Sequence, residues 1–480
     1  MEYQVVIGLE IHVQLLTLSK AFCGDNAEYG GMPNTHVSAI SLGHPGTLPM
    51  HNKVAVDHAI KVGLALNCNI REFNEYARKN YFYADLPKGY QITQDKTPIC
   101  TGGHVTIRTK DGVEKNVNLT RIHMEEDSGK SMHDQDLTDS LIDYNRAGVA
   151  LIEIVSEPEM RSAEEAFQFV TEIRKLVRYL GICDGNMEEG SLRCDANISV
   201  MPVGSTTFGT KVEVKNMNSI TNVRRAIEFE TERQIALCEK GETFPSETRS
   251  FNALKGITIS LRNKELANDY RYFPEPDLPP LVLSEHYIKK IKEEMPALPA
   301  ELFARLKNEL SLTDYDAQVI TEDRPTAEYF LEIIKHTSNF KSAANWMMGA
   351  IRSYLNEKAI DISAFNKKVA PQKIAALIAL IDEGKLSHTA AAQQVFPALA
   401  EDSAKEPLEV AESLNIIQSG DESLIDSIVE EALSKFPDKI EEYRSGKKGL
   451  LGLFVGEAMK LSKGKADPKK VNEAVTKKLG

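Results

Sequence analysis

The chain of 480 residues carries a formal net charge of −13, and 42% of its residues are hydrophobic. The length predicts about three domains, the composition is that of an ordinary globular protein, and the acidic balance excludes wholesale coating of nucleic acid but not a local basic patch. No apolar stretch approaches the roughly 18 residues of a membrane helix, so no membrane partner is expected. The six cysteines are scattered without a CxxC pair, and the first residues read as a strand rather than a signal peptide, so we expect reduced thiols in the cytoplasm.

The first predicted element is a strand, because residues 4–15 alternate between apolar and polar side chains. The odd positions are all apolar, while Glu10, His12 and Gln14 follow Gly8 at the even positions. The ordinary interpretation is a polar face that meets solvent, as in most antiparallel sheets. One alternating strand does not decide between that interpretation and a functional face.

Four later stretches repeat this alternation, at residues 119–127, 191–200, 211–216 and 256–264. Their polar positions carry these charged residues: Arg121, His123, Glu125, Arg193, Asp195, Lys211, Glu213, Lys215 and Arg262. A sixth strand, at residues 147–158, is apolar on both faces except for Glu153, which indicates a central strand with one acid where water is scarce. Two helices are predicted between the strands, at residues 163–180 and 222–239.

The acids of these strands converge if the strands share one sheet and one polar face. Clustered carboxylates repel one another unless a cation neutralises them. Mg²⁺ suits such a site, because it uses a few carboxylates and leaves positions for water and phosphate. The predicted group is Glu10, His12, Glu125, Asp195 and Glu213. His12 is either a ligand or a hydrogen-bonded neighbour, and a solvated face without metal remains the alternative.

Basic and aromatic residues alternate in the segment ARKNYFYADLPKGYQITQ, residues 77–94. Aromatic rings among cations stack bases and hold phosphates. Lys79, Tyr81, Tyr83 and Lys88 are therefore candidate substrate-binding residues, together with Arg193 on the polar face. The alternative is that the aromatic rings belong to the core and that Lys79 is a surface charge.

The second half of the chain reads as helical. A proline-rich stretch at residues 273–281 excludes a helix or a central strand there. Short helices are predicted at residues 299–310, 326–337, 341–357, 370–385, 387–401 and 421–436. The predicted fold class is α+β: a domain at residues 1–294 around a largely antiparallel sheet, a helical domain at residues 295–405, and a small helical tail domain at residues 406–480.

Several long motifs resemble one enzyme family. They are GLEIHVQL, ARKNYFYADLPKGYQITQ, EEDSGK, DYNRAGVALIEIVSEP, EGSLRCDANISV, EVKNMNS, DYRYFPEPDLPP and GKKGLLGLFVGEAMK. From end to end the chain is similar to B subunits of the tRNA-dependent amidotransferase that acts on Asp-tRNA(Asn) and Glu-tRNA(Gln). The resemblance implies a ligase in which ATP phosphorylates the side-chain carboxylate of Glu or Asp misacylated on tRNA. Ammonia then displaces the phosphate to give the amide.

The resemblance also implies partners and ligands. An amidase-type A subunit would supply ammonia through a channel, and a small C subunit would complete the heterotrimer. The catalytic Mg²⁺ of the family matches Glu10, His12 and Glu125 in the domain at residues 1–294. A second, more transient cation site matches Asp195 and Glu213.

The tail carries a basic stretch within an acidic protein. The resemblance implies that this tail domain binds the outer corner of tRNA, and we assign that contact to Lys447, Lys448, Lys460 and Lys463. The pattern by itself is more typical of a solvated helical surface with flexible turns.

One loop departs from the family pattern. Many relatives carry a four-cysteine zinc motif after the first strand, with C-x-C followed by C-x-x-C. This chain keeps Cys23, and Asp25, Ser38 and Ser41 stand at the other three positions. One thiolate does not make a closed tetrahedral site, so we expect no structural zinc and a loop held by packing or by a partner.

Two other functions remain open from the sequence. The chain would be a non-catalytic tRNA-binding scaffold if its acids were structural, and a stand-alone carboxylate–amine ligase if it used free ammonia. Acids in the middle of strands on one face favour catalysis over the scaffold.

Overall fold

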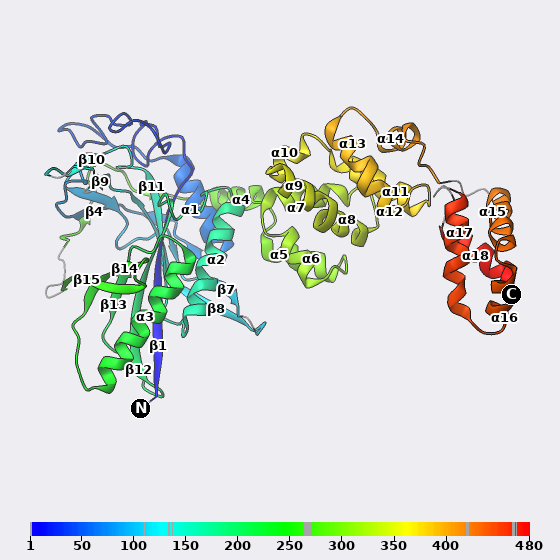
Figure 1. Cartoon of the computed structure of the whole chain (residues 1–480). Coiled ribbons are helices and arrows are strands. Elements are labelled where there is room, and N and C mark those ends of the chain that lie inside the picture. Colours follow the sequence, from blue (N-terminus) through cyan, green and yellow to red (C-terminus); the bar gives the residue numbers. More distant parts are fainter. Residues whose placement is uncertain are drawn as a thin grey trace. The chain divides into compact units, whose positions relative to one another are not determined.

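The computed structural model describes residues 2–109, 111–132, 135–136, 138–263, 270–418, 422–462, 466 and 468–480. The chain divides into two compact units, Met1–Leu298 and Pro299–Gly480 (Figure 1). The first unit is built on a large sheet and the second is helical. The predicted α+β class is therefore confirmed, and the first unit ends just after the predicted boundary at residue 294. The further division at residues 405 and 406 stays a prediction.

The first strand lies inside the main sheet. β1 (Tyr3–Gln14) pairs with β11 (Ala150–Ser156) on one side and β12 (Leu192–Pro202) on the other, antiparallel to both. The strand order is β15-β14-β13-β12-β1-β11-β8-β5-β4-β16. The other strands in this order are β4 (Ala77–Asn80), β5 (Tyr90–Thr93), β8 (Glu114–Glu126), β13 (Val212–Lys215), β14 (Glu247–Asn252), β15 (Ile257–Asn263) and β16 (Phe273–Pro274). The β13–β14 pair is parallel, and the rest of this path is antiparallel, as predicted.

Short strands complete the first unit. β2 (Asn69–Ile70), β6 (Cys100–Thr101) and β7 (His104–Arg108) attach to the main sheet beside β8. Two small ribbons pair β9 (Lys130–Met132) with β10 (Leu141–Asp143), and β3 (Phe73–Asn74) with β17 (Leu281–Val282). The proline-rich stretch contributes only two-residue strands, because proline lacks the N–H that an inner strand donates.

Three helices cover the apolar face of the main sheet: α1 (Lys53–Ala65), α2 (Ala163–Tyr179) and α3 (Ile220–Glu239). Each begins at a polar residue whose side chain accepts a hydrogen bond from a backbone N–H of the first turn. These residues are Asn52, Ser162 and Ser219. The two helices predicted between the strands are confirmed within two residues. Because the odd positions of β1 are buried under this layer, the even positions point away from it.

One strand inverts its predicted alternation. In β15, Ile259 and Leu261 are exposed by 45% and 60%, while Thr258 is buried. The reason is an ion-pair network beneath the strand: Thr258 donates to buried Glu230 of α3 at 2.8 Å and accepts from Arg249 at 2.8 Å. A buried charge network needs a polar strand face, so the rule that apolar residues point inward fails here.

The second unit is a chain of short helices. They are α5 (Pro299–Asn308), α6 (Asp314–Ile320), α7 (Arg324–Ile333), α8 (Phe340–Trp346), α9 (Arg352–Lys358), α10 (Ile362–Asn366), α11 (Pro371–Asp382), α12 (His388–Ala390), α13 (Phe396–Glu401), α14 (Pro407–Ser413), α15 (Glu422–Ser434), α16 (Pro437–Arg444), α17 (Leu451–Leu461) and α18 (Pro468–Leu479), preceded in the first unit by α4 (Glu285–Glu294). π-helical turns join α8 to α9 and α12 to α13, so the predicted helices at residues 341–357 and 387–401 are confirmed. The tail helices share a hydrophobic cluster that includes Val429, Phe454 and Val475. Within the described ranges, no helix is long and apolar enough to span a bilayer.

Candidate functional site

Strand register lines up polar side chains on the sheet face away from α1, α2 and α3. His12 of β1 pairs with Glu153 of β11 on one side and Arg193 of β12 on the other. Glu153 in turn pairs with His123 of β8. These residues form one cross-strand row, which we call the histidine row. The solvated-face interpretation does not account for it, because charged groups this close and this buried require partners.

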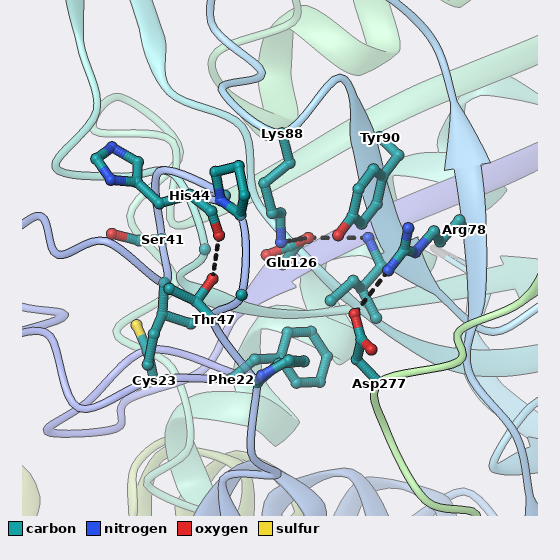
Figure 2. Close-up of a pocket in the computed structure, with 17 residues that line it drawn as sticks. Phe22, Cys23, Ser41, His44, Thr47, Arg78, Lys88, Tyr90, Glu126 and Asp277 are labelled. Carbon is teal, nitrogen blue, oxygen red and sulfur yellow. Dashed lines mark hydrogen bonds and ion pairs between the residues drawn. The ribbon is translucent and has the colours of Figure 1, made fainter.

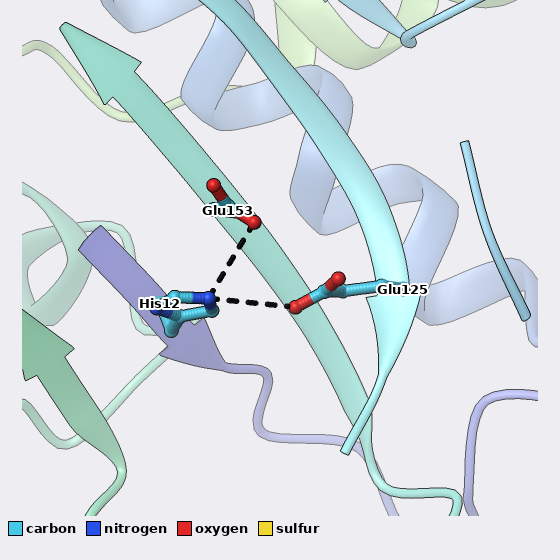
Figure 3. A group of neighbouring side chains, drawn as sticks. All are labelled: His12, Glu125 and Glu153. Carbon is cyan, nitrogen blue, oxygen red and sulfur yellow. Dashed lines mark ion pairs between the residues drawn. The ribbon is translucent and has the colours of Figure 1, made fainter. Parts of the chain in front are cut away.

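Glu125 completes a compact group with two members of the histidine row (Figure 3). His12 Nε2 lies 3.5 Å from Glu153 Oε2 and 3.7 Å from Glu125 Oε1. From the other side, His123 Nε2 lies 3.3 Å from Glu153 Oε2 and 3.6 Å from Glu125 Oε2. Two imidazoles therefore share two buried or nearly buried carboxylates.

The electrostatics of this group reflect that sharing. Burial lowers the pKa of His123, but the hydrogen-bonded and charged Glu125 and Glu153 outweigh burial and raise it to about 9. The pKa of His12 is raised in the same way, chiefly by Glu153 against burial. Burial raises the pKa of Glu153, yet the two imidazoles hold it well below its usual range. Without a metal ion, the histidines thus serve as the cations of the group.

A second group lies beside the first and contains only carboxylates. One oxygen each from Glu10, Asp195 and Glu213 lies within 4.8 Å of the others. Glu10 is directly across the strand pair from Asp195, and it accepts a 2.9 Å hydrogen bond from Asn197. Burial and the neighbouring acids raise the pKa of Glu10. Lys215 offsets part of the charge, because its Nζ lies 2.5 Å from Asp195 and 2.9 Å from Glu213.

Both donor sets fit a divalent cation. The all-carboxylate group matches the oxygen ligands that Mg²⁺ prefers, and two carboxylates with one imidazole suit Mg²⁺ or Mn²⁺. The Nδ1 atom of His123 is buried without a hydrogen-bond partner. Only the other ring nitrogen, Nε2, contacts the two acids. The five predicted ligands lie in two neighbouring groups: Glu10 groups with Asp195 and Glu213, and Glu153 of the first group also raises the pKa of Glu10.

The ligand prediction missed three residues of the site. Glu153 carried a signal, since it is the one acid in a strand that is otherwise apolar on both faces. His123 and Lys215 also stand on predicted polar faces, but their contacts depend on which strands are neighbours. Period-two alternation gives the face of a side chain and not the order of strands.

Comparison with known proteins finds relatives that align along the whole chain. The model of the GatB/GatE catalytic domain matches residues 5–289, and that of the GatB domain matches residues 328–479. The aspartyl/glutamyl-tRNA(Asn/Gln) amidotransferase subunits B of Thermodesulfovibrio yellowstonii and Trichlorobacter lovleyi are 47% and 49% identical to this chain over 479 residues. That of Geobacter sulfurreducens is 49% identical over 483 residues, and each alignment covers 100% of both chains.

The chain belongs to the GatB family. The resemblance found in its motifs is thereby confirmed. The matched catalytic domain contains every residue of the two clusters of candidate metal ligands.

Three of the predicted substrate-binding residues of this GatB-family chain lie in an aromatic cluster. The Tyr81 ring centroid lies 5.8 Å from Tyr83 and 6.2 Å from Tyr270, and Tyr270 lies 6.0 Å from Tyr272. Lys79 Nζ lies 4.9 Å from the Tyr270 ring centroid. Burial and the charge of Glu125 are among the causes that raise the pKa of Tyr81, which places this ring near the histidine row.

Lys88 does not join that cluster. Its ammonium forms an ion pair with Glu126, which leaves β8 on the face opposite Glu125. Both line a pocket of about 250 Å³ beneath the loop at residues 22–49 (Figure 2). Arg78 borders the same pocket, held by Glu275 at 2.7 Å and Asp277 at 3.0 Å.

Arg193 lies at the end of the histidine row but is committed to another partner. Its Nη2 donates to Asp127 Oδ2 at 2.9 Å, and Gln14 donates to the same carboxylate oxygen at 2.8 Å. Arg193, Arg146 and these hydrogen bonds hold the pKa of Asp127 below its usual range despite burial. Arg193 is thus paired with Asp127.

The predicted tRNA-binding lysines do not form one cluster. Lys447 pairs with Glu442 at 3.0 Å, and Lys448 lies 4.2 Å from the Tyr443 ring centroid, both just before α17. Lys460 is exposed in the last turn of α17, about 18 Å away at ~1.5 Å per residue. Lys463 lies outside the described residues.

The four positions of the family's zinc motif do come together in this chain. Ser41 Oγ donates to Asp25 Oδ2 at 2.6 Å and accepts from the Ser38 amide at 3.0 Å. Cys23 is hydrogen-bonded to Asp25, which helps to lower the pKa of that carboxyl. Hydrogen bonds therefore connect the positions that thiolates would occupy.

Proposed function

We propose that this subunit uses ATP to activate the side-chain carboxylate of Glu or Asp misacylated on tRNA(Gln) or tRNA(Asn), which ammonia then converts into the amide. The observation that supports this most is the presence of two clusters of candidate metal ligands on one sheet face. The clusters are built from β1, β8, β11, β12 and β13. The names of the relatives, which act on these tRNAs as amidotransferase subunits B, agree with it.

The chain's own residues would perform distinct tasks. His12, Glu125 and Glu153 would hold one Mg²⁺, and Glu10, Asp195 and Glu213 a second, exchangeable cation. When bound, Mg²⁺ supplies positive charge beside the phosphates as the phosphoryl group moves. The aromatic cluster around Tyr81 would orient the aminoacyl end of the tRNA, because positioning provides much of the rate enhancement when two anions must meet.

The partners are part of the same proposal. An amidase-type A subunit would release ammonia from glutamine, a small C subunit would brace the pair, and the tail would hold the tRNA. A subunit of this kind works in the compartment of translation, which agrees with the cytoplasmic location expected from the sequence.

The decisive experiment measures ADP release and amide formation by the purified complex with misacylated tRNA. ADP release that requires this tRNA, and that disappears in Glu125→Gln, supports the proposal. Amide formation by a complex that releases no ADP would favour the scaffold function instead. Turnover of the isolated chain with ammonium chloride would favour the stand-alone ligase.

A further inference from the structure

Arg121 lies on the site face of β8 because it alternates in step with His123 and Glu125, just after a bulge between β8 and β11. Val155 pairs with Arg121, but the next residue, Ser156, pairs with Leu119, so β8 contains one extra residue there. Leu119 and Ile122 are both buried in the core, although strict alternation would place them on opposite faces. The bulge accounts for both observations, and from Arg121 onward β8 alternates regularly, so Arg121 is on the polar side with His123 and Glu125.

On that side, Arg121 shares a cross-strand row with acids. Val155 lies between Arg121 and Glu10, and Glu10 pairs in turn with Asp195. Two strand spacings separate Arg121 from Glu10, roughly 10 Å at about 4.8 Å per strand. Lys215 contacts Asp195 beyond it. The row therefore has an acidic centre with one cation at each end.

Arg121 differs from two other cations of this face in having no ion pair within the described parts of the chain. Lys215 pairs with Asp195, and Arg193 pairs with Asp127. For Arg121, no hydrogen bond or ion pair joins the guanidinium to any other residue in the described parts of the chain, and its Nε is buried without a partner. Arg193 Nε is also buried without a partner, but the Arg193 guanidinium is held by Asp127. A buried donor without a partner costs stability, so a guanidinium with no ion pair at all points to a ligand rather than to the fold.

The neighbours of Arg121 place it between the aromatic cluster and the carboxylates. Burial, Asp95 and Tyr270 raise the pKa of Tyr272 to about 12, and the charge of Arg121 opposes that rise. Glu125 also acts on the same phenol. Tyr272 therefore lies close to both Arg121 and Glu125.

We propose that Arg121 binds the terminal phosphate of the nucleoside triphosphate while that phosphoryl group is transferred. This inference rests on the proposed function. In that step an oxygen of the substrate carboxylate forms a bond to the γ-phosphorus. The bond between the γ-phosphorus and the β–γ bridging oxygen breaks, and that oxygen leaves with its electron pair as part of ADP. A planar guanidinium donates two parallel hydrogen bonds to phosphate oxygens. Metal-binding acids on one side and Arg121 on the other would hold the phosphate between them.

The test compares Arg121→Met and Arg121→Lys with wild type in the purified complex. The matched control is Arg71→Met, an exposed arginine of the same unit outside the site. We expect Arg121→Met to lower kcat/KM for ATP about 100-fold, the usual effect of losing one such donor, and Arg121→Lys to retain part of it. Binding of a fluorescent, non-hydrolysable ATP analogue with Mg²⁺ should weaken in parallel, while filter binding of misacylated tRNA should not.

Three results would overturn the assignment: unchanged ATP kinetics and analogue binding in Arg121→Met, an equal loss in Arg71→Met, or weakened tRNA binding with normal ATP kinetics. If Arg121→Met melts early, Arg121→Lys decides, and wild-type kcat/KM for ATP in that variant contradicts the bidentate contact. A wild-type complex that consumes no ATP would contradict the proposed function itself. Normal wild-type turnover beside an unaffected variant would contradict only the role of Arg121.

Discussion

The ammonium nitrogen of Lys215 lies 2.5 Å from a carboxylate oxygen of Asp195. The same nitrogen contacts Glu213 at 2.9 Å. Burial lowers the pKa of Lys215, but the two acids outweigh burial and raise it, so the side chain is a cation at neutral pH. A divalent ion at the all-carboxylate group and the Lys215 ammonium therefore compete for the same oxygens.

Replacing Lys215 should strengthen metal binding at this group. Lys215→Met removes the competing charge, so we expect the dissociation constant of the weaker Mn²⁺ site to fall about tenfold, equivalent to ~1.4 kcal/mol. Electron paramagnetic resonance of free Mn²⁺ measures this at pH 8. Glu213→Gln is the opposite control and should weaken the same site. Equal Mn²⁺ affinity in wild type and Lys215→Met would show that the ammonium does not compete.

Glu153→Gln should abolish most transamidation although sequence patterns did not place Glu153 among the ligands. The amide keeps the size of the side chain but withdraws charge from His12 and His123. We expect turnover to fall by about 10²–10³, as in Glu10→Gln and Glu125→Gln, while glutamine hydrolysis in the complex persists. The exposed Glu188→Gln is the matched control. Full turnover of Glu153→Gln at limiting Mg²⁺ would remove this residue from the site.

Purified protein should contain less than about one zinc per chain, because a closed site needs about four ligands. The converging side chains of Asp25, Ser38 and Ser41 allow a positive control. The variant Asp25→Cys, Ser38→Cys, Ser41→Cys should take up one zinc, measured by elemental analysis after mild chelation. Stoichiometric zinc in wild type would contradict the hydrogen-bonded loop.

Cys23 should react slowly with alkylating agents. Burial and the charge of Asp25 raise the pKa of its thiol to about 11. At pH 8 only about one-thousandth is then thiolate, against roughly a quarter of an unperturbed thiol. Because a raised pKa moves ionisation to higher pH, the rate should climb about tenfold per pH unit between pH 8 and 10. Iodoacetamide labelling read by peptide mass spectrometry checks this, with the unfolded chain as control. A rate that levels off below pH 9 would contradict it.

Removing the tail should affect tRNA affinity more than chemistry. α14 packs against α11 and α13, so the truncation should begin after residue 418 to spare those contacts. We expect the KM for misacylated tRNA to rise at least about tenfold, and the dependence of binding on salt to flatten, because phosphate contacts release counterions. Steady-state kinetics measure the KM, and filter binding across a salt series measures the salt dependence. The double variant Lys447→Ala, Lys448→Ala tests one end of α17, and Lys460→Ala tests the other. Loss of kcat at unchanged KM would assign the tail to assembly.

Alternation in the sequence was sufficient to predict the faces of β1, β8 and β12 correctly. It failed at β15, where Thr258 faces inward because the charges of Glu230 and Arg249 are buried beneath it. The local pattern shows which side chains of a strand share a face. It contains no information on whether the layer packed against that face is apolar or charged.

The partition of the site was also beyond the pattern. Glu10 groups with Asp195 because Asp195 of β12 and the apolar Val155 of β11 lie opposite it, whereas His12 lies opposite Glu153 of β11. Leu119 and Ile122 are both buried because of one extra residue in β8. Strand order and bulges come from pairing between distant segments, which a period of two cannot encode. Lys88 illustrates the same limit, since its partner Glu126 lies on the opposite face of β8 from Glu125.

The position of β1 between β11 and β12 has a consequence during synthesis. The first strand emerges early, but both of its neighbours are translated only after residue 149, many seconds later at about 5–20 residues per second. Through that interval a nascent chain carries β1 with open edges, which are the surfaces that recruit foreign strands. Glu10 and His12 place charge in the middle of the strand, and charged side chains discourage such pairing. The residues proposed to bind the metal in the finished protein would thus protect the unfinished one from aggregation.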